Sequence, residues 1–299
     1  MLHKFERCLL GLAVGDALGM PVEGLSREQI KKIYGEINDF LPSPYKDLEA
    51  GEFTDDTEQA LLVAEVIIEN LFFDPEKFAE KLKNWFLRAK RIGPTSSKAI
   101  HRLLIGYDWR SSGLPSDTCG AATRVAPIGL VYSFNLDLVE KYAEISAIVT
   151  HRSDVAIAAA SAVALAVTCN ILGYKDDEML EIVTKRIKDE ILADKILLSY
   201  EIKSEGLDVA VEKIGNSISS YDTVPIAFYC FFSGKNFEES LKLAANAGGD
   251  TDSIAAICGA LKGSAGFEIP RRWLEKLKDR ERIQEISSKL FETHSLILS

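Results

Sequence analysis

Apolar residues recur every three or four positions along most of the chain, which is the spacing of helices with one buried face. Leu61, Ala64 and Ile68 form one such series. Almost no segment alternates apolar and polar residues between turn signals, so we expect minimal β structure. The pattern predicts an all-α fold.

Several short motifs mark helix ends. Ser26 to Gln29 reads as a capping box, and Gly35 can end the short helix that follows. Asp74-Pro75 places a capping carboxylate directly before proline at the first helical position. Asn236 to Glu239 repeats the capping pattern. These signals predict helices that begin at each motif.

Irregular structure is expected in two places, from about Glu36 to Phe53 and from about Gly106 to Pro115. Neither stretch is a low-complexity linker, and no internal repeat is evident. Because nothing divides the chain, residues 1–299 are expected to form one compact domain of many helices packed orthogonally.

Two segments resemble targeting or membrane elements. The N-terminal residues have a charged and then an apolar region, but Glu6 and Asp16 interrupt it and no cleavage site follows. Val155 to Leu172 carries no charge and is at the lower limit of length for a membrane span. Its Ala and Val content favours a helix buried on all sides in a helical core. We therefore expect a cytoplasmic protein that does not enter a membrane.

The formal net charge is −10 and the pI is about 5.1. Binding to nucleic acid regardless of sequence depends on Lys and Arg at the phosphates, so this charge argues against such partners. The five cysteines form no CxxC pair and fit no zinc motif. They are expected to be reduced and mostly buried as small apolar residues.

Two segments, Phe53 to Glu58 and Gly248 to Ser253, are unusually rich in oxygen ligands. Each places two aspartates and two hydroxyls in four consecutive positions directly before an apolar helix. One interpretation is helix capping, because Ser, Thr and Asp are preferred caps and acidic residues suit the helix dipole.

The alternative interpretation is a metal site. The following helices are apolar nearly all round, so their starts should be partly buried, and buried carboxylates require cations or hydrogen bonds. Each segment also supplies more acceptors than a cap uses. Mg²⁺ and Mn²⁺ prefer oxygen ligands, and if the segments converge they suffice for two ions about 3.5–4 Å apart.

Five motifs in order resemble the ADP-ribosylglycohydrolase family over nearly the whole chain. They are Gly11 to Gly24, Thr54 to Thr57, Gly120 to Gly129, Thr150-His151 and Gly248 to Ala256. The resemblance implies an all-α fold with a binuclear Mg²⁺ or Mn²⁺ site between helix N-termini. It implies metal ligands at Thr54, Asp55, Asp56, Asp250, Asp252 and Ser253, the last position being usually Thr in the family.

The resemblance also implies roles at the substrate. Catalytic positions would be Glu23, Asp55, Asp56 and Asp252. Substrate-binding positions would be Gly93, Ser116, Asp117, Thr118, Cys119, Gly120 and His151. Two of these have plain structural alternatives, since Glu23 can be a solvated loop carboxylate and His151 a cap or a hydrogen-bonded structural group.

Three departures from the family pattern bear on the substrate. Cys119 replaces an Asn, and Thr123 replaces a Met. Arg91-Ile-Gly93 stands where some members have Asp-Xaa-Gly with a catalytic Asp. If that Asp is the general base there, this protein uses another group, such as Glu23 or a metal-bound water.

The expected function is a metal-dependent hydrolase, acting as a monomer. It would cleave the N- or O-glycosidic bond between ADP-ribose and an acceptor, which is a protein side chain or a small molecule. The alternatives are a catalytically inactive structural relative, like a crystallin, and a hydrolase of another nucleotide-sugar or phosphate substrate on the same scaffold.

Overall fold

The computed structural model describes all residues from 1 to 299 and, apart from two isolated bridges, contains only helices and loops. The all-α prediction is confirmed. The α-helices are α1 (Leu2–Gly19), α2 (Arg27–Tyr34), α3 (Asp55–Asn70), α4 (Pro75–Phe86), α5 (Pro94–Leu104), α6 (Trp109–Ser112), α7 (Ala126–Val131), α8 (Leu136–Ile148), α9 (Asp154–Leu172), α10 (Asp176–Arg186), α11 (Glu190–Glu201), α12 (Leu207–Ile214), α13 (Ser220–Ser233), α14 (Phe237–Ala245), α15 (Thr251–Ser264), α16 (Arg271–Lys276) and α17 (Arg280–Leu298). Two short 3₁₀ helices, η1 (Met20–Val22) and η2 (Cys119–Ala121), complete the set.

The predicted helix starts are confirmed. Ser26 and Gln29 make both bonds of a capping box at α2, Asp74 caps α4, and Asn236 caps α14. The predicted loop from Gly106 to Pro115 is interrupted by the single turn of α6, which Asp108 caps. Helices this short bury too few residues to show a periodic pattern, so the sequence did not reveal it.

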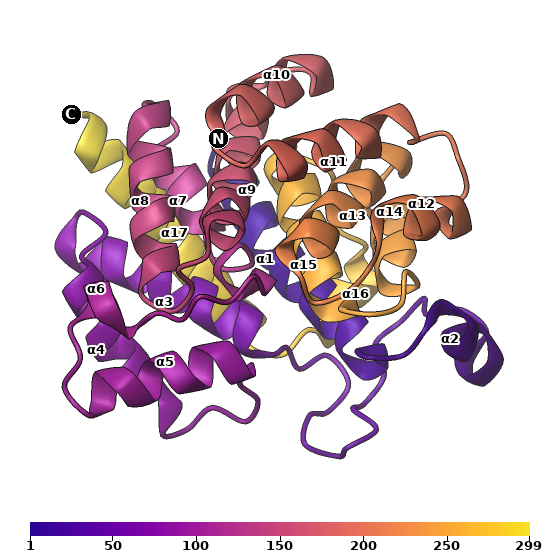
Figure 1. The fold of residues 1–299 in the computed structure, drawn as a ribbon, viewed down its shortest axis with the longest axis horizontal. Coiled ribbons are helices and arrows are strands. Elements are labelled where there is room, and N and C mark those ends of the chain that lie inside the picture. Colours follow the sequence, from indigo (N-terminus) through magenta and orange to yellow (C-terminus); the bar gives the residue numbers. More distant parts are fainter.

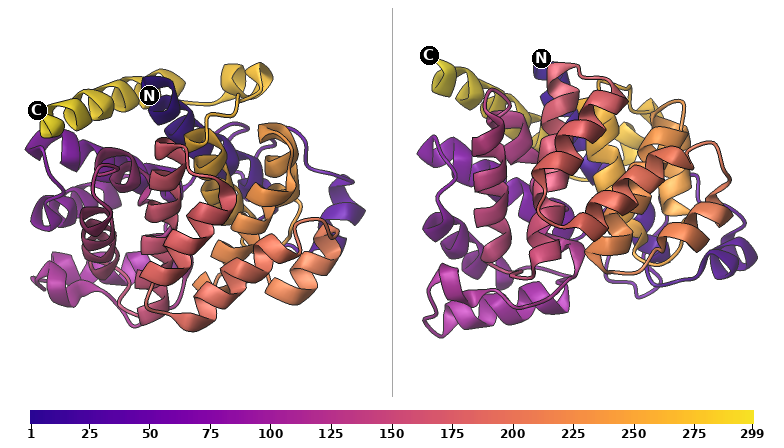
Figure 2. Two further views of the ribbon diagram at one scale, coloured as in Figure 1. Left: turned by 90° about the horizontal axis from the view of Figure 1, so that it is seen from above. Right: turned by 45° about the horizontal axis from the view of Figure 1, so that its top comes forward.

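Helices α1, α9 and α15 occupy the middle of the molecule. In Figure 1 the helices α3 to α8 lie to one side of them and α11 to α14 to the other, while α2 projects at the edge. Figure 2 shows α17, in yellow, running beside the N-terminal part of α1. Helix α9 is long and apolar enough to cross a membrane, but 89% of its apolar window is buried inside the protein. It is the core helix that its composition predicts.

Helices α1 and α15 approach so closely that backbone meets backbone. A Cβ atom on Gly15 would lie 1.9 Å from the carbonyl oxygen of Ala255, and one on Gly11 would lie 2.4 Å from that of Gly259. Gly19 is equally close to Thr251, at 2.2 Å from its oxygen. The glycines recur every four residues on α1, so they form one face along the whole contact.

Helix α1 also holds the starts of two other helices. Thr251 at the start of α15 donates through Oγ1 to the carbonyl oxygen of Gly19 at 2.8 Å. The buried Asp16 carboxylate accepts from the backbone N–H groups of Thr54 and Thr57 at 3.0 and 3.1 Å, and from Thr57 Oγ1 at 2.6 Å. Both acidic segments of the sequence are therefore anchored to the same helix.

Replacing Gly15 with alanine should destabilise the protein strongly, because the new methyl group overlaps the backbone of α15. We expect a loss of about 3 kcal/mol in the free energy of unfolding, measured by urea denaturation. Gly206→Ala is the matched control, since a Cβ there meets nothing within 4 Å. Its cost should be about 1 kcal/mol or less. Equal losses in the two variants would contradict the close contact.

Candidate active site

The two acidic segments meet at the starts of α3 and α15. Ser253 Oγ donates to Asp56 Oδ2 at 2.8 Å, which joins residues almost 200 positions apart in the sequence. Glu23, just after η1, extends the same group, because its carboxylate oxygen and those of Asp250 and Asp252 lie within 4.8 Å of one another. The convergence that a metal site requires is thus present, whereas the number of ions that it holds stays a prediction.

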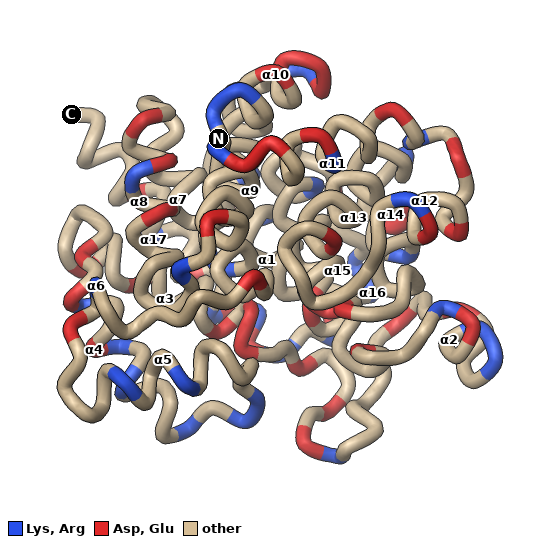
Figure 3. The backbone as a smooth tube through the Cα atoms, viewed as in Figure 1, with Lys and Arg blue, Asp and Glu red and all other residues tan.

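The aspartates of this group are largely buried and lack cationic partners, whereas Glu23 is exposed and pairs with Arg91. Asp56, Asp250 and Asp252 are only 5–7% exposed. Lys or Arg side chains form ion pairs at many surface positions, yet none pairs with these three groups or with Asp55. Figure 3 accordingly shows acidic residues in the middle of the molecule as well as at its periphery.

Burial raises the pKa of every carboxyl group in the cluster. The pKa of Asp55 is raised to about 7, chiefly by burial and further by the charges of Asp16 and Glu23. Burial and neighbouring carboxylates raise the pKa values of Asp56 and Asp252 well above their usual range. All these groups can be ionised together at neutral pH only if added positive charge offsets their repulsion.

The departures Cys119 and Thr123 both touch this cluster. Cys119 Sγ donates to Asp250 Oδ2 at 2.9 Å, and Thr123 Oγ1 donates to Asp56 Oδ1 at 2.8 Å. Thr223 on α13 gives a second bond to Asp250, at 3.1 Å. Both substituted residues therefore act as hydrogen-bond donors that fix the orientation of a carboxylate.

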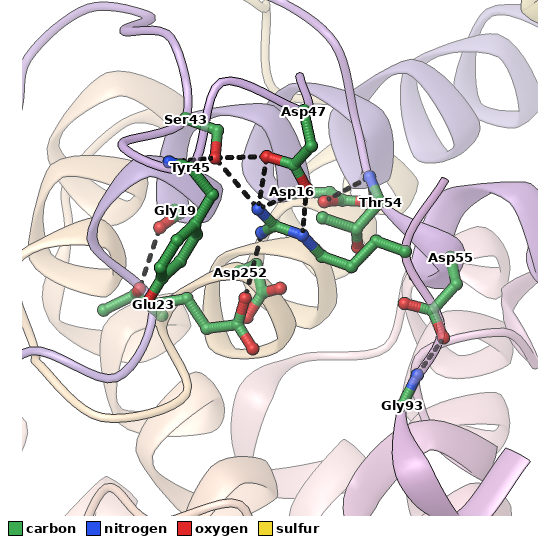
Figure 4. Close-up of polar contacts among 12 residues, drawn as sticks. Asp16, Gly19, Glu23, Ser43, Tyr45, Asp47, Thr54, Asp55, Gly93 and Asp252 are labelled. Carbon is green, nitrogen blue, oxygen red and sulfur yellow. Dashed lines mark hydrogen bonds and ion pairs between the residues drawn. The ribbon is translucent and has the colours of Figure 1, made fainter. Parts of the chain in front are cut away.

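Arg91 connects several residues at the rim of the site through ion pairs and hydrogen bonds. Its guanidinium donates to Glu23 Oε2 at 3.1 Å and to both oxygens of Asp47 at 2.9–3.1 Å (Figure 4). It also donates to Ser43 Oγ at 3.0 Å and lies over the ring of Tyr45. With only 19% of its side chain exposed, Arg91 binds the loop between α2 and α3 to the catalytic candidate Glu23.

A cavity of about 360 Å³ opens beside the cluster. Asp55, Asp56, Asp250, Asp252 and Ser253 line it, and so do the predicted residues Glu23, Gly93, Thr118, Cys119, Gly120 and His151. Three predicted residues do not. Thr54 is the buried N-cap of α3, Ser116 lies behind the lining, and Asp117 is exposed and accepts from Ser219.

The sequence did not single out several residues of the lining. Ile92, Pro94, Thr95 and Ser96 come from the start of α5, and Ile218 comes from the loop before α13. The α5 segment does carry a signal, because Gly93-Pro94 followed by three hydroxyl residues is a third helix start rich in oxygen. Ile218 has no such signal.

His151 is both hydrogen-bonded and part of the lining. Its Nδ1 lies 2.8 Å from Thr150 Oγ1, and its Nε2 lies 3.0 Å from Thr118 Oγ1. Burial, together with the charge of Arg124, lowers the pKa of His151 to about 3. The ring is therefore neutral near pH 7, and the hydrogen-bonded structural interpretation of this residue is confirmed, whereas a role in substrate binding stays a prediction.

The chain is similar along nearly its whole length to known proteins. The sequence profile of the family described as ADP-ribosylglycohydrolase matches residues 1–296. A protein of Archaeoglobus fulgidus, whose name assigns no function, is 62% identical over 100% of this chain and 99% of its own length. ADP-ribosylarginine hydrolase Tri1 of Serratia proteamaculans is 29% identical, with 97% of this chain and 79% of that protein covered.

Human ADP-ribosylhydrolase ARH3 is 26% identical, with 97% of this chain and 93% of that protein covered. A solved structure, titled an ADP-ribosylglycohydrolase-related protein complex, superposes with a TM-score of 0.83 at 28% identity and 98% coverage of both chains. The chain therefore belongs to the ADP-ribosylglycohydrolase family, a family of enzymes that hydrolyse ADP-ribose linkages.

Proposed function

We propose that this chain is a divalent-metal-dependent hydrolase of the glycosidic bond between ADP-ribose and an acceptor. The observation that supports it best is the cluster of buried carboxyl groups without cationic partners beside a cavity of about 360 Å³. Buried charge of one sign is unfavourable in a folded protein unless a ligand compensates it. Such an arrangement is typical of a functional site.

The donor set fits Mg²⁺ or Mn²⁺, which prefer oxygen ligands. Carboxylates of Asp55, Asp56, Asp250 and Asp252 and the hydroxyls of Thr54 and Ser253 would hold two such ions. When bound, these ions supply Lewis-acid stabilisation and make water more acidic.

The protein's own groups have distinct tasks in the cleavage. Departure of the acceptor leaves oxocarbenium-like positive charge on the ribose, and the carboxylates around the cavity stabilise that charge. Glu23 can accept the proton of the attacking water, because its carboxylate faces Asp250 and Asp252 at the cavity wall. Arg91 keeps this carboxylate in place. Gly93 contributes through its backbone N–H, which donates to Asp55 Oδ2 at 3.1 Å (Figure 4).

The residues at the rim of the cavity favour substrates in which ADP-ribose is linked to an oxygen atom over substrates in which it is linked to arginine. A guanidinium acceptor needs a free carboxylate outside the metal ligands. Here Arg91 already pairs with Glu23 and Asp47, the carboxylates at that rim. Tri1 is named for arginine linkages and ARH3 is not, so the relatives leave both classes open.

ADP-ribose should bind only when the metal is present. Calorimetry in Mn²⁺ should detect binding that chelation abolishes and that Asp252→Asn loses, followed by release of ADP-ribose from modified substrates. Metal binding without ADP-ribose binding would instead favour another nucleotide-sugar or phosphate substrate. If neither ligand binds, the chain is an inactive structural relative.

Asp252→Asn should make the metal-free protein more stable, because it removes one of several buried carboxyl groups whose ionisation burial and the neighbouring carboxylates oppose. We expect the Tm to rise by about 3 °C in chelator. Mn²⁺ at about 100 times its Kd should stabilise the wild type by about 2.7 kcal/mol and the variant far less. The control is Asp208→Asn at an exposed ion pair with Arg27, which should keep the full metal response. A lower Tm in metal-free Asp252→Asn would refute the repulsion.

Arg91→Ala should shift the acceptor preference, because it frees the Glu23 and Asp47 carboxylates for a cationic acceptor. The ratio of arginine-linked to serine-linked turnover should rise about tenfold, the effect of one charged hydrogen bond. Arg271→Ala is the control, because the Arg271 side chain is 90% exposed and pairs only with Glu275 on α16. A ratio that does not change in Arg91→Ala would exclude this basis for acceptor choice.

A further inference from the structure

A line of hydrogen bonds leads from a buried cation to the cavity. Arg124 is fully buried, forms no ion pair, and donates from one nitrogen to Thr150 Oγ1 at 2.8 Å. Thr150 Oγ1 lies 2.8 Å from His151 Nδ1, and His151 Nε2 lies 3.0 Å from Thr118 Oγ1. Thr118 Oγ1 in turn donates to Thr95 Oγ1 at 3.2 Å. Thr118 and Thr95 line the cavity.

The cation fixes the direction of the hydrogen bonds in this line as far as Thr118. A guanidinium can only donate, so Thr150 Oγ1 accepts from Arg124. Thr150 is fully buried and has no other partner than Arg124 and His151, so its own hydrogen must go to His151 Nδ1. The opposite arrangement would leave a buried hydroxyl hydrogen without an acceptor, which is strongly unfavourable.

The tautomer of His151 then decides which atom donates in the hydrogen bond to Thr118. With Nδ1 accepting, the proton of the neutral ring lies on Nε2, which donates to Thr118. Because Thr118 Oγ1 accepts from His151, its own hydrogen points to Thr95 Oγ1 at 3.2 Å or to Ser116 Oγ at 3.1 Å. When it goes to Thr95, the hydrogen of Thr95 turns either to Ser116 Oγ, 2.9 Å away, or to a ligand in the cavity. The group that ends the line is therefore a hydrogen donor.

This end of the cavity needs such donors. No Lys or Arg lines it apart from Arg91, whose charge is taken up by Asp47 and Glu23. Two anionic phosphates must therefore be held by neutral donors, and these work best when their hydrogens are already oriented. Gly120 packs directly against His151, since a Cβ atom on Gly120 would lie 3.3 Å from the His151 ring.

We propose that a relay of buried positioning residues orients a pair of cavity hydroxyls so that one hydrogen of the pair is presented to a phosphate oxygen of ADP-ribose. The relay is Arg124, Thr150 and His151, and the hydroxyls are those of Thr118 and Thr95. The identity of the ligand rests on the proposed function, whereas the direction of the relay rests on the buried contacts alone.

The same guanidinium also reaches the acidic end of the cavity. Arg124 donates to Gln59 Oε1 at 2.7 Å, and Gln59 Nε2 donates to Asp55 Oδ2 at 3.2 Å. A substitution of Arg124 would disturb both branches at once. Thr150 belongs only to the branch that leads to the hydroxyls, so Thr150→Val tests that branch by itself.

The direct test is the protonation of His151 in the full-length protein. Nitrogen NMR of ¹⁵N-histidine-labelled protein in Mg²⁺ near pH 7, with His151→Asn to assign the signals, should show a proton on Nε2 and none on Nδ1. A proton on Nδ1 would overturn the relay whatever the protein's activity.

The second test is ADP-ribose affinity by calorimetry in Mg²⁺. Thr150→Val should weaken binding about tenfold, the contribution of one oriented hydrogen bond, and should leave the Mg²⁺-induced rise in Tm intact. Thr150→Ser, which keeps the hydroxyl, should bind as the wild type does. Ser146→Ala should also bind normally, because Ser146 Oγ contacts Arg124 outside the relay, at 3.4 Å.

The outcomes separate this inference from the proposed function. Unchanged affinity in Thr150→Val, or an equal loss in Ser146→Ala, would overturn the relay and leave ADP-ribose hydrolysis standing. A wild-type protein that binds Mg²⁺ but not ADP-ribose would overturn the proposed substrate, and the relay's assignment to its phosphates with it.

Discussion

The close contact between α1 and α15 is the constraint on which the rest of the site depends. Glycines at every fourth position of α1 allow the two backbones to come into contact, and this contact fixes the position of α15 along α1. Thr251 then fixes the start of α15 to Gly19, while Asp16, one turn earlier on α1, fixes the start of α3. One helix thus determines the separation of two acidic helix starts, and a shift of either would separate the carboxylates that must act together.

Burying several carboxyl groups at one place works against stability, and the surroundings reflect that conflict. Each carboxylate is held by neutral donors, such as Thr123 and Ser253 at Asp56 and Thr223 at Asp250, which orient it without cancelling its charge. Donors of this kind leave the negative charge available for a cation. Cys119 and Thr123, which depart from the family pattern, are two more such donors, at Asp250 and Asp56.

Much of the fold and part of the site could be predicted from the sequence, because those features are local. Capping motifs, helical periodicity and the two oxygen-rich helix starts are read within a few residues, and their convergence followed from the resemblance to a family. Contacts set by tertiary packing could not be read in this way. Arg91 pairs with residues 44 and 68 positions away, and Ile218 reaches the cavity only through the path of the chain before α13. Neither the single turn of α6 nor the relay from Arg124 has a periodic signature.

The two ends of the cavity make opposite electrostatic demands. At one end, carboxylates create an excess of negative charge that favours cations. At the other end, the phosphate binding that we propose would fall to neutral hydroxyls, in a protein of net charge −10. A phosphate-binding lysine would lie close enough to pair with the carboxylates and compete with metal. A buried guanidinium behind the wall forms no ion pair with the carboxylates, and hydrogen bonds connect it to the cavity. Arg124 therefore suits a cavity whose ligand carries hydroxyl groups at one end and phosphates at the other, because Gln59 and Thr150 connect it to both.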